Sequence, residues 1–410
     1  MRANPLAMVA DLLRRLGSWL LGLVVRLRRS EARKVIPKPL RRLGYRLLPQ
    51  RRLRDRMTKA EYEEKITAVV PAPQSTDVKI GIITDPLRRH GNYEAACLEL
   101  GVPYELVDIS GADWMEQVQS AGCDAFVVWP SHITTVTKAM FDERLRVLAE
   151  DMGRMLFPSY GALWLYESKR RIRDWFVVHG VPHPETWVFF DAEKAMDFLA
   201  GTDYPLIFKT DLGSSASGVE VVRTKGEAAR IVEKCFGNGY LAHRHDCRDR
   251  QWGQALFQKY VRNAREWRTA RVGDSYFANQ KVRRGEFHSG SREVLYCRPP
   301  DRILDFCREI ADKGPFLSVN IDVLETEDGE LLANEFHAVW GSKQPDLTIV
   351  DGEPGRFRYE ERTRRWKFEP GKYCRHTLCN LRVRTVLELL GKPLDKPFPS
   401  AANVGSGEPG

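Results

Sequence analysis

Apolar and polar residues alternate in two stretches in the C-terminal third of the chain, and this pattern predicts a β-hairpin. Residues 316–324 (FLSVNIDVL) form the first stretch, and residues 331–340 (LLANEFHAVW) form the second. The segment TEDGE lies between them. An Asp-Gly pair favours a two-residue loop because both positions tolerate positive φ. With Asp328 and Gly329 in the loop, the pairing of the two strands is defined.

This register gathers polar side chains on one face of the hairpin, because side chains alternate with a period of two. Glu327 faces Glu330 beside the loop, Asp322 lies opposite Glu335, and Asn320 lies opposite His337. Two directly opposed carboxylates repel each other. They therefore favour a proton or a hard cation between them, and Mg²⁺ is a cation that carboxylates hold together with substrate phosphates. The alternative is a solvated hairpin face that carries ordinary surface charges.

Periodicity elsewhere predicts two further units, so the fold class is α/β followed by α+β. The first unit covers residues 78–160. Its predicted strands are residues 79–84, 104–108 and 125–129, and its helices lie near 93–100, 115–120 and 137–152. Short strands that alternate with helices indicate βαβ units and a small parallel sheet. The second unit covers residues 161–345 and begins with a helix over 168–179, followed by mainly antiparallel strands.

The N-terminal segment differs in charge from the rest of the chain. Residues 1–56 contain 16 Lys/Arg and 3 Asp/Glu, which leaves 48 basic and 52 acidic residues in the remainder. Apolar residues recur at helical spacing over residues 9–27, opposite several arginines, which predicts a basic amphipathic helix on an anionic membrane surface. Its uncharged run is about half of the roughly 20 residues that span a bilayer. The alternatives are docking on the protein itself or a partner, and an organelle presequence.

The remaining boundaries follow from composition. Residues 57–77 are expected to form a linker, residues 346–396 a C-terminal extension, and residues 397–410 a disordered tail. The nearly neutral body gives no support for a nucleic-acid partner. The eight cysteines lack the close spacing of a disulfide framework, which favours a reducing compartment. The expected location is cytoplasmic, peripheral on the inner face of a membrane.

A second group of chemically informative residues follows a predicted strand. Residues 204–222 read YPLIFKTDLGSSASGVEVV, in which Lys209 ends one strand and a Gly/Ser loop leads to the next. Backbone amides and hydroxyls in such a loop can donate to phosphate oxygens, although Gly/Ser hairpins are also common without a ligand. Farther on, the segments LFQKYV, REWR and FANQKVRR place basic residues on strands. Those residues suit a triphosphate, whereas surface charge is the favoured interpretation for Arg284.

The order of these segments over residues 78–345 resembles the ATP-grasp superfamily. It is most similar to carboxylate–amine ligases such as glutathione synthetase and D-alanine–D-alanine ligase. The resemblance is carried by Lys169 before GVPHPET, Lys209 with GSSASG, then FQKYV, EWR and IDVL…DGELLANEFH. It implies a parallel-sheet domain that precedes an ATP-grasp domain, with ATP and Mg²⁺ as cofactors.

The resemblance also implies a role for individual residues. Lys169 and Lys209 would bind nucleotide phosphates, Arg268 would steady the transferring phosphoryl group with help from Lys281, and Glu266 would contact ribose or order a loop. The phosphate loop would be Gly213, Ser214, Ser215, Ser217 and Gly218. The adenine-reading hinge would be Gln258, Lys259, Tyr260 and Val261. The metal ligands would be Asp322 and Glu335, together with His337 and Asn320.

Two positions depart from the pattern of these ligases. His337 stands where the last metal ligand is usually Asn, and imidazole is a poor ligand for Mg²⁺, so Asn320 is the alternative oxygen donor. Gln258 stands where many relatives carry Glu.

The expected activity is ADP-forming ligation of a carboxylate to an amine. The acceptor is expected to be a small molecule, or glycan- or lipid-linked, and anionic, as Lys281, Arg283 and Arg284 suggest. The alternatives are a kinase that phosphorylates a hydroxyl and a non-catalytic ATP-binding protein on a membrane.

Overall fold

The computed structural model describes residues 50–213, 218–242, 249–283, 293–314, 316–341, 344–395 and 398. The predicted amphipathic helix over residues 9–27 therefore lies outside the described residues. Within the described ranges, no helix is both long enough and apolar enough to cross a membrane.

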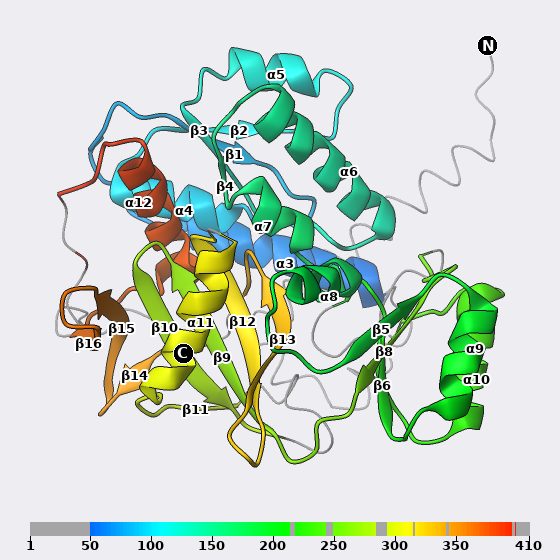
Figure 1. The fold of residues 1–410 in the computed structure, drawn as a ribbon. Helices are drawn as coiled ribbons and strands as arrows, with labels where there is room; N and C mark the ends of the chain where they lie inside the picture. The colour runs from blue at the N-terminus through cyan, green and yellow to red at the C-terminus, as the bar shows by residue number, and fades with distance from the viewer. Residues whose placement is uncertain are drawn as a thin grey trace, which may run out of the picture.

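The N-terminal unit contains a parallel sheet, as the sequence predicts, with the strand order β2-β1-β3-β4 (Figure 1). The strand β4 was not predicted. Its strands are β1 (Ile80–Ile83), β2 (Tyr104–Val107), β3 (Ala125–Val128) and β4 (Leu156–Phe157). Its helices are α4 (Gly91–Leu100), α5 (Trp114–Ser120) and α6 (Thr135–Arg146), and α6 continues as the π-helix η2 (Val147–Asp151). All residues of β1 and β3 are buried, as expected for parallel strands covered on both faces.

A second four-stranded sheet, which is smaller than the eight-stranded sheet described below, has the order β5-β8-β6-β7 and is antiparallel. It consists of β5 (Thr186–Phe189), β6 (Leu206–Lys209), β7 (Val219–Val222) and β8 (Ala255–Lys259). The helices α9 (Ala192–Gly201) and α10 (Lys225–Phe236) cover its outer side (Figure 1). The helices α7 (Tyr160–Leu165) and α8 (Lys169–Val178) connect this sheet to the N-terminal unit.

The largest sheet has the order β13-β12-β9-β10-β15-β14, with β11 paired to β10 and β16 paired to β15. Its strands are β9 (Arg265–Val272), β10 (Ser275–Lys281), β11 (Val294–Leu295), β12 (Ser318–Glu325), β13 (Leu331–His337), β14 (Ile349–Val350), β15 (Glu353–Glu360) and β16 (Arg365–Pro370). Helix α11 (Asp301–Lys313) packs against β9 and β10. The apolar positions of β12, Val319, Ile321 and Val323, share a core cluster with α11. The alternate positions of β12 therefore face the opposite side.

The hairpin β12–β13 confirms the predicted pairs but not the predicted loop. Asp322 pairs with Glu335, and Asn320 pairs with His337. The loop, however, is one residue longer than the predicted Asp-Gly turn. Thr326 donates its backbone N–H to Glu330 O, and Gly329 has a φ of +83°, so the expected facing of Glu327 and Glu330 is wrong.

A β-bulge corrects the offset that the longer loop introduces. Val323 pairs with Ala333, whereas Asp322 pairs with Glu335, so Asn334 is the extra residue on β13. Such a bulge re-aims side chains and is common beside active sites. Two departures from the regular hairpin thus cancel at the polar end.

Two helical segments outside these sheets pack on α4. Helix α3 (Gln50–Thr67) occupies half of the expected linker over residues 57–77 and packs on α4. The two helices approach closely at Gly91, because a Cβ atom added to this glycine would lie 2.9 Å from the side chain of Ile66. In the C-terminal extension, the 3₁₀-helix η3 (Arg375–Leu378) and α12 (Cys379–Leu389) also contact α4. The linker prediction is therefore corrected for residues 57–67, because apolar residues of this stretch pack on α4.

Candidate functional site

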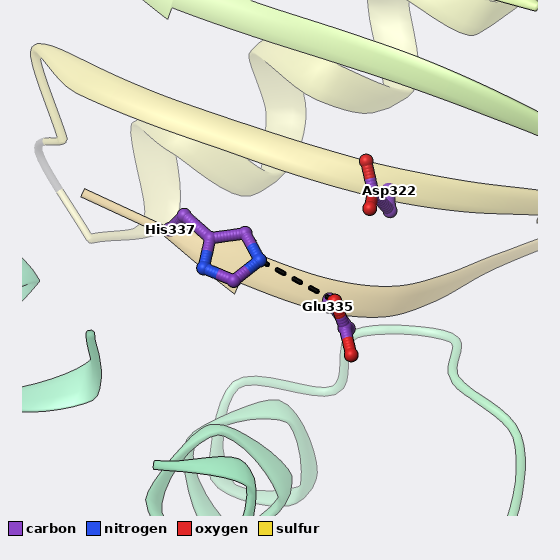
Figure 2. Close-up of side chains that lie close together, drawn as sticks. All are labelled: Asp322, Glu335 and His337. Atoms are coloured by element: carbon purple, nitrogen blue, oxygen red, sulfur yellow. Dashed lines mark hydrogen bonds and ion pairs between the residues drawn. The ribbon is translucent and has the colours of Figure 1, made fainter. Parts of the chain in front are cut away.

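Three potential metal ligands meet at the polar end of the β12–β13 hairpin. One ligand atom each from Asp322, Glu335 and His337 lies within 4.8 Å of the other two. Figure 2 shows Asp322 on one strand and the other two residues on the next, with the imidazole directed at Glu335. His337 Nε2 lies 3.4 Å from Glu335 Oε2. The strand register creates this cluster, because all three side chains occupy the same face of adjacent strands.

Two cations from neighbouring strands contact Asp322. Arg268 Nε on β9 lies 3.3 Å from Asp322 Oδ1, and Lys281 on β10 donates to Asp322 Oδ2. Burial alone would raise the pKa of Asp322, but Lys281 and Arg268 outweigh it and lower the pKa to about 2. Asp322 is therefore a carboxylate at neutral pH.

Glu335 is also held in its charged form. Burial would raise its pKa, but the hydrogen bond with His337 and the nearby charge of Lys169 hold the pKa well below its usual range. The site therefore presents two permanent carboxylates on neighbouring strands, which is a donor set that hard divalent cations favour.

Lys281 on β10 joins two buried carboxylates, one on the adjacent strand β9 and one on β12, the strand beyond β9. It donates to Glu266 as well as to Asp322, and its side chain is 8% exposed. Burial raises the pKa of Glu266. The ribose contact expected of Glu266 stays a prediction, and its observed partner is Lys281.

Lys209 and Lys169 approach this cluster from the smaller sheet and from α8. Lys209 Nζ donates to Asn334 Oδ1 over 2.9 Å, and Lys169 Nζ donates to the carbonyl of Gly213 over 2.8 Å. Burial lowers the pKa of Lys209 to about 8, partly offset by Glu335. A buried lysine with no carboxylate within ion-pair distance among the described residues can accept an anionic ligand.

A cavity of about 20 Å³ lies between the smaller sheet and β13. Its polar lining includes Lys169, Lys209, Gln258 and Asn334, and its apolar lining includes Ile172, Phe176, Leu256 and Ala333. Gln258 Nε2 donates to Thr186 Oγ1 over 3.0 Å. The structure thus brings three of the predicted nucleotide-binding residues to one apolar-walled pocket.

The rest of the predicted hinge lies outside this pocket. Lys259 is exposed and its Nζ lies 3.3 Å from Glu185 Oε2, whereas its backbone N–H donates to Glu185 O. Tyr260 Oη accepts a hydrogen bond from Arg283. Neither these side chains nor that of Val261 line the cavity, so the role predicted for residues 259–261 rests on the backbone.

The predicted phosphate loop is described only at its two ends. Thr210 N donates to Gly218 O over 2.8 Å, and Gly218 has a φ of +77°. An alanine Cβ at Gly218 would lie 2.0 Å from Thr210 Oγ1, so glycine is required there. Ser214, Ser215 and Ser217 lie outside the described residues.

Sequence reasoning missed two side chains that contact His337 or its partner. Glu167 Oε1 lies 3.7 Å from His337 Nδ1 and 3.6 Å from His132 Nε2. Glu167 directly precedes α8, and His132 follows β3 at the carboxyl end of the parallel sheet. Of these two residues, only His132 could have been predicted from the sequence, because it follows a parallel strand and ligands bind outside the carboxyl ends of such strands.

The donor set fits a divalent cation that also contacts phosphate. Besides the two carboxylates, Asn320 Oδ1 is buried, and no donor reaches it within the described ranges. Asn320 Nδ2 donates to Thr269 O over 2.7 Å, which leaves the amide oxygen free. The pocket lysines supply positive charge for an anionic ligand.

No protein-family model matches the chain, and no curated protein sequence matches it. Solved structures do match. An ATP-grasp RimK domain protein from Sphaerobacter thermophilus is 19% identical, with a TM-score of 0.45, over 63% of this chain and 90% of its own. The biotin carboxylase domain of 2-oxoglutarate carboxylase from Hydrogenobacter thermophilus, solved with MgADP, ADP and bicarbonate, is 15% identical with a TM-score of 0.47.

That second match covers 65% of each chain, which is less than two thirds of the biotin carboxylase domain. A third, the ATP-grasp ligase PsnB with a minimal precursor, is 16% identical with a TM-score of 0.46, over 64% of this chain and 91% of its own. Two of these three solved structures are described as ATP-grasp proteins.

Proposed function

We propose that the protein is an ATP- and divalent-cation-dependent ligase that activates a carboxylate as an acyl phosphate. The observation that carries this proposal is the approach of two amines to a pair of carboxylates. The carboxylates of Asp322 and Glu335 lie opposite each other on the hairpin. The amines of Lys169 and Lys209 are close enough to lower the pKa of Glu335, and Glu335 in turn raises that of Lys209.

The proposed roles follow from charge and position. Lys209 and Lys169 would bind the phosphates of ATP, and Gln258 and the backbone of residues 259–261 would contact the base. Arg268, whose side chain is 27% exposed, would contact the transferring phosphoryl group. A divalent cation bound by the hairpin carboxylates would neutralise phosphate charge.

The reaction needs no covalent intermediate with the protein. An oxygen of the acceptor carboxylate forms a bond to the γ-phosphorus as the bond to ADP breaks. An amine nitrogen then bonds to the acyl carbon, phosphate leaves with the electron pair of the broken C–O bond, and the amine releases one proton to solvent. The chain's own contribution is positioning and charge neutralisation.

A second cavity supports an anionic acceptor. It measures about 260 Å³ and lies between α6, the start of α8 and the segment that precedes Gly213. Its charged lining has one more cation than anions: Lys138, Arg170, Arg171 and Arg250, with Asp142, Asp211 and Asp249. Lys138 and Arg171 pair with Asp142, and Arg170 pairs with Asp211, just as Lys281 pairs with two carboxylates. Arg284 lies outside the described residues. The support for an anionic acceptor is therefore the surplus of one positive charge in the lining of this cavity.

The acceptor is further proposed to be associated with the cell envelope, through contact of residues 1–56 with an anionic membrane. The charge of that segment supports this, because a basic residue near an anionic bilayer contributes about 1 kcal/mol.

Hydroxylamine trapping tests the proposed chemistry. Incubation with ATP, Mg²⁺, hydroxylamine and pooled carboxylates should yield ADP, phosphate and a hydroxamate. The Glu335→Gln variant should yield none, whereas Glu330→Gln, an exposed carboxylate on the same hairpin, should behave as the wild type. Formation of AMP and pyrophosphate would contradict the mechanism. A stable phosphorylated product without hydroxamate would indicate a kinase, and nucleotide binding without any product would indicate a non-catalytic protein.

A further inference from the structure

His337 lies between two carboxylates, one facing each ring nitrogen. Nε2 faces Glu335 at 3.4 Å, and Nδ1 faces Glu167 at 3.7 Å. The ring is nearly buried, with 14% of the side chain exposed. Its Nε2 is also the atom directed toward the cluster that contains Asp322 (Figure 2).

Glu167 is buried between two imidazoles. Its side chain is 4% exposed, and its φ of +56° is uncommon for a residue with a side chain. His132 approaches Oε1 at 3.6 Å from the N-terminal unit, and Oε2 has no hydrogen-bond donor within the described part of the chain. A buried carboxylate of this kind favours a ring N–H of His337 directed at it.

This arrangement is typical of a histidine that binds a metal ion. Such a histidine donates its other ring N–H to a carboxylate or carbonyl, which sets the tautomer and the direction of the lone pair. In this structure Nε2 faces Glu335 as a hydrogen-bond donor. A cation bound by the two hairpin carboxylates would take the place of that proton, and with Nδ1–H directed at Glu167 the lone pair of Nε2 would then point toward the cation. The donor set of the hairpin then has one nitrogen and two carboxylates.

A nitrogen ligand changes which cations the site prefers. Mg²⁺ is held almost only by oxygen, whereas imidazole suits later divalent transition metals. An amide at this position would supply oxygen and favour Mg²⁺. The residue that departs from the oxygen pattern of related ligases is thus the one that a buried carboxylate orients.

We propose that His337, positioned by Glu167, is a ligand that makes the hairpin site selective for a divalent transition-metal ion over Mg²⁺. This rests on the proposed nucleotide site, at which the cation meets the phosphates. Mg²⁺ still binds through the carboxylates and the nucleotide. The competing explanation is that His337 only neutralises the two carboxylates that flank it, and that explanation predicts no change in metal preference when the imidazole is removed.

The test measures metal affinity in the full chain without relying on turnover. Calorimetric titration of Co²⁺ and of Mg²⁺ is made into protein that is saturated with a non-hydrolysable ATP analogue. The wild type is compared with His337→Asn, Glu167→Gln and the matched control His376→Asn. His376 also pairs with a carboxylate, Glu99, at 2.6 Å, and its φ of +45° suits asparagine.

The ratio of Co²⁺ affinity to Mg²⁺ affinity should fall about 10-fold or more in His337→Asn, and by a smaller factor in Glu167→Gln. The control should keep the wild-type ratio. The visible absorption of Co²⁺ bound to the wild type should differ from that of Co²⁺ with the nucleotide analogue alone, and this readout needs no variant to fold.

The test distinguishes failure of the metal-selectivity inference from failure of the proposed nucleotide site. An unchanged affinity ratio in folded His337→Asn, or a Co²⁺ spectrum that matches an all-oxygen environment, would overturn the inference while the nucleotide site stands. Absence of analogue binding with any cation would overturn the proposed function and the inference together.

Discussion

Replacement of Lys209 by methionine should stabilise the nucleotide-free protein while it removes nucleotide binding. Lys209 is buried, with 6% exposure, and its amine has one hydrogen-bond acceptor, Asn334 Oδ1, among the described residues. Methionine keeps the apolar stem of similar length and carries no charge. The substitution therefore separates the cost of a buried amine from the packing of its side chain.

The magnitude follows from the pKa. Burial lowers the pKa of Lys209 from 10.5 to about 8, which corresponds to about 3 kcal/mol of extra free energy to carry the charge in the folded state. Loss of the hydrogen bond to Asn334 costs about 1 kcal/mol. The free energy of unfolding should thus increase by about 2 kcal/mol at pH 7.

The gain should depend on pH. Because the folded pKa of Lys209 lies below the unfolded value, the wild type gains stability as pH rises from about 8 toward 10.5. At pH 10 only about 1 kcal/mol of the cost remains, so wild type and variant should be about equally stable. Urea unfolding at pH 7 and pH 10 measures both differences.

The control is Lys259→Met, which removes an exposed lysine that is paired with an exposed glutamate, both side chains being 65% exposed. It should change stability by less than about 0.5 kcal/mol at either pH. A Lys209→Met variant that is less stable than the wild type at pH 7, or a gain that is equal at both pH values, would refute the reasoning.

Three other perturbations test separate parts of the structure. Lys281→Met should lower the free energy of unfolding by about 3–5 kcal/mol, because it leaves two buried carboxylates without their shared cation; urea unfolding should show a smaller loss at pH 5 than at pH 8, and equal losses would contradict this. Gly218→Ala should lower the melting temperature because its Cβ would collide with Thr210, whereas Gly226→Ala, with no atom within 4 Å of the added Cβ, should not; equal melting temperatures would show that the loop adapts. Deletion of residues 1–49, which spares α3, should abolish sedimentation with anionic vesicles but not nucleotide binding, and unchanged sedimentation would exclude the membrane proposal.

The hairpin shows how local sequence rules can reach a correct pairing through an incorrect turn. The Asp-Gly signal located the turn, and alternation placed Asp322 opposite Glu335, as observed. The sequence did not reveal that the loop is one residue longer or that Asn334 forms a bulge. Both features depend on tertiary contacts, since Asn334 accepts a hydrogen bond from Lys209 and Ala333 N donates to Pro182 O.

Other parts of the site lay beyond a single-sequence argument for a different reason. Lys169 begins helix α8 and Lys209 ends strand β6. Both boundaries are recognisable in the sequence, so the positions of the two lysines were predictable. The contacts of Glu167 with His132 and His337 join residues far apart in the sequence, and they exist only once the N-terminal unit packs on the large sheet. Helix α11, by contrast, had a clear signal in the helical spacing of its apolar residues that the sequence analysis did not use.

The measurement that tests the central claim most directly is calorimetry of a non-hydrolysable ATP analogue binding to the full chain, with and without Mg²⁺. The wild type is compared with Glu335→Gln and with Glu330→Gln, which makes the same change at the exposed end of the same hairpin. The account predicts cation-dependent binding by the wild type and by Glu330→Gln, and loss of the cation dependence in Glu335→Gln. Binding that is unaffected by Mg²⁺ in the folded wild type, or that is equal in all three proteins, would contradict it.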